Sequence, residues 1–87
     1  MKALRAYDIV APLGVYQLLR TLGRSPRREI ELFLYRLALQ PGLPGDFETP
    51  AEDGRTHQVK MVGRWLVSYW IDHAVREVRV TGIEPVE

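Results

Sequence analysis

The sequence contains no cysteine, and this absence excludes several kinds of chemistry. A chain without cysteine has no disulfide framework, no thiolate nucleophile and no zinc–thiolate site. Its two histidines, His57 and His73, are not accompanied by further ligands at the spacing of a metal site. The sequence therefore predicts a protein with no metal and no other cofactor. The absence of disulfides fits a cytoplasmic location.

Long hydrophobic runs are also missing. The longest, LFLYRLAL, is interrupted by Arg36 and falls far short of the roughly 20 residues that span a bilayer. The N-terminal residues MKALRAYDIV lack a sustained apolar core followed by a small-residue cleavage site, so we expect no signal peptide. The sequence predicts no association with a membrane.

No strong excess of one charge is present, since the chain has 12 basic and 11 acidic side chains. Residues 1–29 carry six basic and two acidic groups, residues 30–52 one basic and four acidic, and residues 53–87 five of each. A nucleic-acid binder that relies on its overall field carries a larger positive excess. Any binding to nucleic acid must therefore come from local patches.

The length and composition predict a single domain that spans residues 1–87, with 46% hydrophobic and 26% charged residues. Residues 2–10 predict a first strand. A helix is expected after Pro12 and before Gly23, and a second helix with Ser25 as N-cap and Pro26 as its first residue. The predicted buried faces of the two helices consist of Val15, Leu18, Leu19 and Leu22, and of Ile30, Phe33, Leu34, Leu37 and Ala38.

The second half of the chain predicts strands. Residues 45–54 are acidic and rich in turn formers, which indicates an exposed loop. Strands are expected at residues 57–62 and 64–71, joined by a tight turn at Gly63, and a last strand contains Val78, Val80 and Ile83. The order β-α-α-β-β-β predicts an α+β fold in which a helix hairpin packs on one face of a small, mainly antiparallel sheet.

The predicted faces of this sheet suggest a binding surface. Trp65, Val67, Tyr69 and Ile71 share one face of their strand, and Arg64, Leu66, Ser68 and Trp70 share the other. Lys60, Arg64 and Arg79 are expected on the face without helices, because Val59, Met61, Val78 and Val80 suit the core. These cations are either the polar half of amphipathic strands or part of a surface that binds single-stranded nucleic acid. A protein partner is equally compatible with exposed tryptophan and arginine.

Three other features have both a structural and a functional interpretation. Imidazole is an effective acid or base near neutral pH, so His57 and His73 are candidates for such a role, although a single histidine beside a turn is more often solvated. The segment GRSPRRE is either a soluble helix start or a patch for phosphate or an acidic partner. The acids of residues 45–54 are better explained by a solvated loop than by acid–base chemistry; they are Asp46, Glu48, Glu52 and Asp53.

The segments YDIVAP, VYQLLRTLGRSPRREIELFLYRLALQPG and GRTHQVKMVGRWLVSYWIDHAVREVRVTGIE together resemble the RelE/ParE superfamily of type II toxin–antitoxin toxins. The resemblance extends over residues 6–84. It implies a small cytoplasmic bacterial toxin that is bound by a cognate antitoxin. The RelE-like branch inhibits translation as an endoribonuclease that cleaves mRNA on the ribosome without a metal.

By this resemblance, Lys60 and Arg64 are the candidate catalytic residues. The candidate RNA-binding or partner-binding residues are Arg55, His57, Trp70 and Arg79. The sequence departs from the RelE pattern, because Leu66 and Glu84 stand where arginines are usual. Two alternatives therefore remain open: a non-catalytic, ParE-like inhibitor of DNA gyrase, and a toxin fold that only binds its antitoxin.

Overall fold

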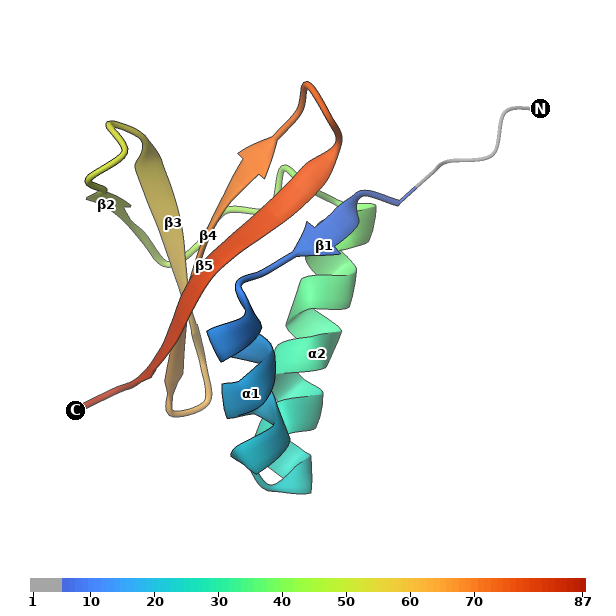
Figure 1. Ribbon diagram of the computed structural model, residues 1–87, viewed down its shortest axis with the longest axis vertical. Coiled ribbons are helices and arrows are strands. Elements are labelled where there is room, and N and C mark those ends of the chain that lie inside the picture. The colour runs from blue at the N-terminus through green and yellow to red at the C-terminus, as the bar shows by residue number, and fades with distance from the viewer. Residues whose placement is uncertain (1–5) are drawn as a thin grey trace.

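Two α-helices lie against one five-stranded sheet in the computed structural model, which describes residues 6–87 (Figure 1). This architecture confirms the predicted α+β fold. The elements are β1 (Asp8–Val10), α1 (Leu13–Thr21), α2 (Arg24–Leu39), β2 (Phe47–Pro50), β3 (Thr56–Val62), β4 (Trp65–Asp72) and β5 (Glu77–Pro85). The part of the first predicted strand at residues 2–5 lies outside the described residues. Within the described part, neither helix has the length and apolarity that crossing a membrane requires.

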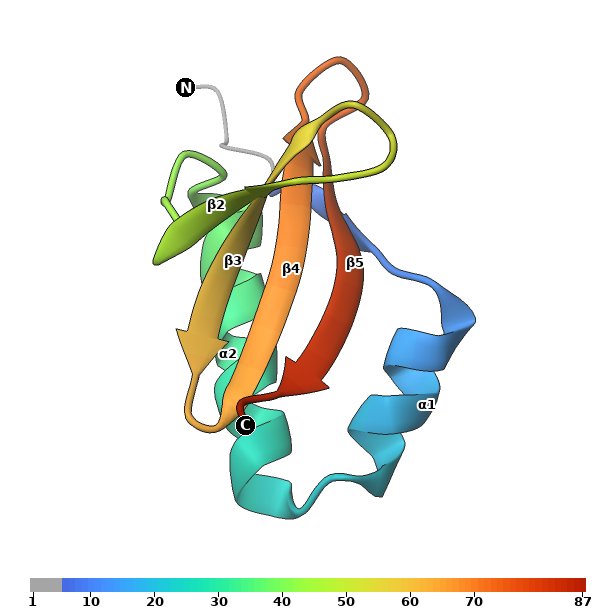
Figure 2. The ribbon, with the colours of Figure 1, turned by 90° about the vertical axis from the view of Figure 1, so that its left-hand side faces the viewer.

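The strand order in the sheet is β1-β5-β4-β3-β2. β1 pairs with β5 in parallel, and every other pairing is antiparallel, as the sequence predicted. Figure 2 shows α2 behind the sheet and α1 beside β5. One face of the sheet is therefore covered by helix, and the opposite face is left without one.

The helix faces predicted from apolar spacing form the core. Ile30 and Leu37 of α2 are fully buried against Val67, Tyr69 and Val78 of the sheet. The ring of Phe33 meets that of Tyr69 edge to face, with ring centroids 5.7 Å apart. Such an arrangement suits the quadrupoles of two aromatic rings. These contacts identify the face of the sheet that packs against α2.

The predicted start of α2 is wrong. The helix begins at Arg24 with Gly23 as its N-cap, and no side chain caps it. Pro26 lies inside the first turn instead of opening it. A proline is tolerated there because the first four N–H groups of a helix have no intrahelical partner.

β2 replaces part of the loop predicted at residues 45–54. The backbone N–H of Asp46 donates to the carbonyl of Val59 at 2.8 Å, and Phe47 to Pro50 then continue the pairing with β3. The chains approach closely because residue 45 is glycine: a Cβ at Gly45 would lie 2.7 Å from the Val59 carbonyl oxygen. A long-range contact therefore forms this strand, whose own sequence, FETP, is weak in strand propensity.

The register of β3 reverses one predicted face. Val59 pairs with Ser68 and Met61 with Leu66, so both lie on the face away from the helices, whereas Lys60 pairs with Val67 on the helix side. The predicted gathering of Lys60 with Arg79 is thus wrong. Apolar residues alternate along β3, yet Val59 is buried on the face without helices. Alternation alone therefore does not show which face of the strand packs against the helices.

Candidate functional site

Four residues predicted from the sequence come together on the sheet face away from the helices. They are Arg55, His57, Trp70 and Arg79, and we refer to them, with the acids Asp53, Asp72 and Glu77, as the Trp70 cluster. Trp70 and Arg79 are direct cross-strand partners on β4 and β5. Arg55 ends the β2–β3 loop, and His57 follows on β3. Three strands and a loop therefore build the cluster.

Trp70 is the centre of the cluster. The guanidinium carbon of Arg55 lies 4.2 Å from the centroid of the indole ring, and that of Arg79 lies 5.7 Å from it. Both distances are within the range of cation–π attraction. The ring thus holds two positive charges near one another.

Arg79 is bound by carboxylates. Its Nη2 atom donates to Oε1 of Glu77 at 2.7 Å, and its Nε atom lies 3.7 Å from Oδ2 of Asp72. Nε is buried and makes no hydrogen bond at that distance. The Nε–H of this guanidinium is therefore an unused donor.

His57 is buried, which corrects the expectation of a solvated side chain. Its Nε2 atom lies 3.1 Å from Oδ2 of Asp53, and its Nδ1 atom lies 3.4 Å from Oγ1 of Thr81. An ionised carboxylate only accepts hydrogen bonds, so in the neutral imidazole Nε2 carries the proton and the lone pair is on Nδ1. Thr81 is the extra residue at a β-bulge, where Val80 pairs with Tyr69 and Gly82 with Ser68.

Asp53 also corrects the sequence interpretation, because it is part of this network. Its Oδ1 atom accepts the backbone N–H of Arg55 at 2.8 Å. That hydrogen bond is the main reason that the pKa of Asp53 is lowered, and the hydrogen bond with His57 and the charge of Arg55 lower it further, against partial desolvation. Asp53 therefore stays ionised and orients the imidazole. The spacing D-G-R-T-H, with Gly54 at a φ of 81°, is the sequence feature that could have indicated this.

An open cavity of about 570 Å³ adjoins the cluster between β4 and the loop after α2. Its lining includes Pro41, Leu43, Arg55, Gln58 and Trp70. Cavities of this size accommodate small organic ligands, and a nucleotide falls in that range. Arg55 and Trp70 thus border both the cavity and the cluster.

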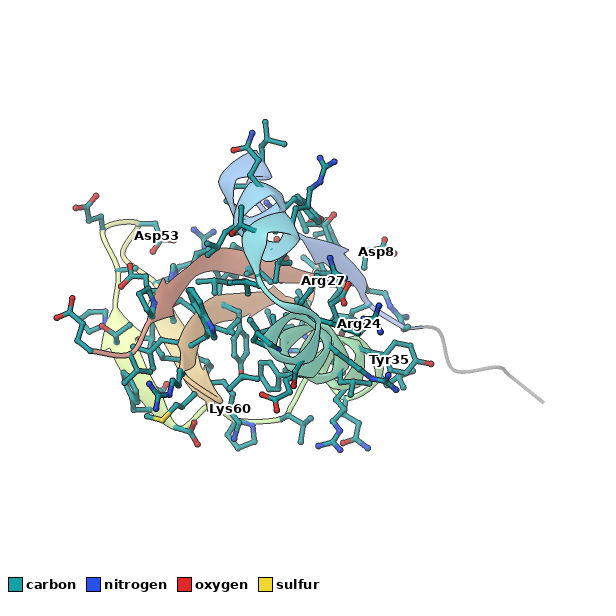
Figure 3. The ribbon with its side chains drawn as sticks, turned by 90° about the horizontal axis from the view of Figure 1, so that it is seen from below. Asp8, Arg24, Arg27, Tyr35, Asp53 and Lys60 are labelled. Atoms are coloured by element: carbon teal, nitrogen blue, oxygen red, sulfur yellow. The ribbon has the colours of Figure 1, made fainter. Side chains whose placement is uncertain are left out.

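Lys60 and Arg64, the residues predicted to be catalytic, do not join the cluster. The Nζ atom of Lys60 lies 3.2 Å from Oδ1 of Asp46, and Lys60 lines a cavity against α2 on the helix side. Figure 3 shows Lys60 and Asp53 well apart. Arg64 is exposed in the β3–β4 turn. The pKa of Asp46 is lowered by the backbone N–H of Met61 and by Lys60, so Lys60 is held by an ionised partner.

The other histidine lies elsewhere. Nδ1 of His73, in the β4–β5 loop, is 2.9 Å from the hydroxyl of Tyr7, and their rings meet edge to face. This contact connects the loop to the start of the described chain. Among residues 6–87, no group of three or more histidine and acidic side chains is arranged to hold a metal ion.

The fold resembles those of solved toxins in complex with their antitoxins. The RelE–RelB complex of Pyrococcus horikoshii matches with a TM-score of 0.76 and 15% identity, over 92% of this chain and 94% of the other. A RelBE-type complex of Mycobacterium tuberculosis matches with a TM-score of 0.69 and 14% identity, over 98% and 97%. The E. coli RelBE complex matches with a TM-score of 0.63 and 16% identity, over 94% and 99%.

Sequence comparison adds nothing to this likeness, since no protein-family model and no curated protein matches the chain. The structural matches extend over nearly the full length of both partners in each pair. The chain therefore has the fold of RelE toxins, as the resemblance in its sequence predicted.

Proposed function

We propose that this protein is the toxin of a type II toxin–antitoxin pair and that its Trp70 cluster cleaves RNA. The observation that supports cleavage is the placement of His57. Its imidazole is oriented by Asp53 and lies in the same network as the guanidiniums of Arg55 and Arg79. A base beside two cations is what metal-independent cleavage of a phosphodiester requires.

The chemistry follows from these roles. Nδ1 of His57 takes the proton of a ribose 2′-hydroxyl once the substrate replaces the weak contact with Thr81. The 2′-oxygen then attacks the adjacent phosphorus, the bond from phosphorus to the 5′-oxygen breaks, and that oxygen receives a proton from the imidazolium or from water. Arg55 and Arg79 stabilise the additional negative charge on the phosphate. The products are a 2′,3′-cyclic phosphate and a 5′-hydroxyl.

Trp70 and the neighbouring cavity would bind the nucleobase. Single-stranded RNA is commonly held by stacking on aromatic rings and guanidinium planes. The paired Arg55 and Trp70 side chains offer such a plane at the edge of the cavity. The proposed substrate is thus mRNA, reached on the ribosome in the cytoplasm.

The proposed partner that restrains the toxin is a cognate antitoxin. The matching structures from three organisms are complexes of a toxin with its antitoxin. Exposed apolar side chains of α2 recur at i, i+3 and i+7, and so share one face of the helix: they are Leu32, Tyr35 and Leu39. An apolar surface of this kind is typical of a protein that is covered by a partner.

A toxin without catalysis is a second candidate, and the charge balance of the site favours it. The two guanidiniums of the Trp70 cluster are accompanied by three carboxylates, those of Asp53, Asp72 and Glu77. A phosphate must compete with these acids. A non-catalytic protein that inhibits DNA gyrase, or one that only binds its antitoxin, does not need to bind a phosphate at this site.

Induced expression in a bacterial host distinguishes these functions when growth, protein synthesis and DNA synthesis are followed by pulse labelling. RNA cleavage predicts a rapid loss of protein synthesis, with DNA synthesis falling later. An early loss of DNA synthesis supports the gyrase alternative. Normal growth with folded protein accumulating contradicts toxicity.

A further inference from the structure

The turn between the two helices carries a concentration of arginine. Arg20 lies in the last turn of α1, and Arg24, Arg27 and Arg28 lie at the start of α2, so four arginines occur within residues 20–28. Figure 3 looks onto this end of the molecule and shows Arg24 and Arg27 at the near end of α2. We call these four residues the arginine end.

These arginines differ from the cations of the sheet. Arg55, Lys60 and Arg79 each have an acidic partner. None of the four residues of the arginine end forms an ion pair with any residue between 6 and 87. Their charge is thus available to a ligand, whereas the charge of the Trp70 cluster is largely neutralised within the protein.

The arrangement does not serve stability. The first turn of α2 contains no acidic residue, and its N-cap makes no side-chain hydrogen bond. Cations at a helix N-terminus are opposed by the helix dipole, and neighbouring arginines repel one another. A stable helix start would carry acids at these positions.

The arginine end is remote from the Trp70 cluster. In Figures 1 and 2 the α1–α2 turn lies at the bottom of the molecule, and the β2–β3 loop that carries Asp53 and Arg55 lies at the top. The β3–β4 turn is also at the bottom, and a Cβ at its Gly63 would lie 2.9 Å from the carboxylate of Glu29 on α2. This turn adds Arg64, which likewise forms no ion pair among the described residues.

We propose that the arginine end binds the phosphate backbone of structured RNA, so that one end of the molecule supplies affinity and the other end supplies the site of reaction. The choice of RNA rests on the function proposed above. The choice of a nucleic acid over a protein rests on the surface itself: no large apolar side chain within residues 17–31 is prominently exposed, and the exposed Tyr16 and Leu32 lie one helical turn further from the α1–α2 turn than Arg20 and Arg28 do. The centre of a protein interface needs apolar anchors, whereas a phosphate backbone needs only charge and hydrogen-bond donors.

Binding of a fluorescein-labelled RNA hairpin tests this proposal. The full-length chain carries His57→Gln so that the probe is not cleaved, and Kd is measured from about 50 to 200 mM KCl. Four phosphate contacts predict a slope of log K against log salt of about −3 to −4. Replacing Arg20, Arg24, Arg27 and Arg28 by glutamine should remove most of this slope and weaken binding at low salt by more than about tenfold.

The control is Arg36→Gln. Arg36 is an exposed arginine of α2, and it too forms no ion pair within the described chain. The substitution should change the slope by no more than about one. Glutamine preserves helix propensity, so the quadruple variant should unfold at the same temperature or a higher one.

Three results overturn the proposal. The first is a quadruple variant that binds the hairpin like the parent, and the second is an Arg36→Gln variant that loses as much affinity as the quadruple variant. The third is a quadruple variant that still binds RNA but no longer binds the antitoxin. The first two deny a specific arginine end, and the third makes it a protein-binding surface. Failure of the proposed function has a different signature. In that case the chain without His57→Gln binds the hairpin through these arginines and cleaves no RNA.

Discussion

The guanidinium of Arg55 lies over the indole ring of Trp70, 4.2 Å from its centroid. The two residues come from the β2–β3 loop and from β4, and Arg79 of β5 approaches the same ring. The arginine side of the cluster therefore depends on one aromatic side chain. Without that ring, the two guanidiniums have only carboxylates to hold them.

Trp70→Ala should weaken binding of single-stranded RNA by about 5- to 100-fold, because a stacking surface is lost and Arg55 is released. Trp70→Phe keeps a flat ring and should retain most of the affinity. Fluorescence anisotropy with a labelled single-stranded RNA measures both variants. An alanine variant that binds as well as the parent contradicts the role of Trp70, provided that circular dichroism shows it folded.

Gly45→Ala should lower the free energy of unfolding by about 1 to 3 kcal/mol, since the new Cβ would overlap the backbone of Val59 and separate β2 from β3. Gly42→Ala is the matched control, because a Cβ there meets nothing within 4 Å and its φ is not in the left-handed region. Urea unfolding followed by circular dichroism measures both. Equal stabilities for the two variants would show that this close approach is not needed.

The stability of the protein should fall in acid. The pKa of Asp46 is lowered in the folded state by the N–H of Met61 and by Lys60, and that of Asp53 mainly by the N–H of Arg55. A carboxyl whose folded pKa lies below its unfolded value stabilises the fold at pH values well above 3.8, and this contribution is lost as the pH falls through the lower value.

Asp46→Asn removes one of these groups, so the variant should lose less stability than the parent between neutral pH and about pH 2. The control is Glu52→Gln, which changes an exposed carboxyl of the β2–β3 loop and should leave the pH dependence nearly unchanged. Urea unfolding at a series of pH values gives the comparison. A parent and an Asp46→Asn variant with parallel profiles would exclude Asp46 as a source of the acid sensitivity.

The parts of the fold that apolar periodicity determines could be predicted from the sequence. The stripe of α2 and the faces of β4 each contain residues too apolar to be left in water, such as Leu37 and Val67, and both are fully buried. These positions locate the core and place Trp70 on the opposite face. The meeting of Trp70 with Arg79 then follows from strand pairing, whereas Arg55 reaches the same ring from the β2–β3 loop.

The remaining features depend on contacts between distant segments. Val59 and Lys60 exchange faces relative to the prediction because register is set by pairing with Ser68 and Val67, which alternation in β3 does not encode. β2 exists because Gly45 admits the backbone of Val59. The bond between Asp53 and His57 depends on a loop conformation, so the sequence indicated an isolated histidine where the structure has an oriented one.

Cleavage of mRNA on programmed ribosomes by the purified protein tests most directly whether His57 is the base that cleaves RNA. His57→Gln keeps a donor for Asp53 but has no basic nitrogen, and it should slow cleavage by about 100-fold or more. Lys60→Ala, on the opposite face, should cleave like the parent, and the products should end in a 2′,3′-cyclic phosphate. If a folded His57→Gln variant cleaves at the parental rate, or if Lys60→Ala is the variant that fails, the site of reaction is not the Trp70 cluster.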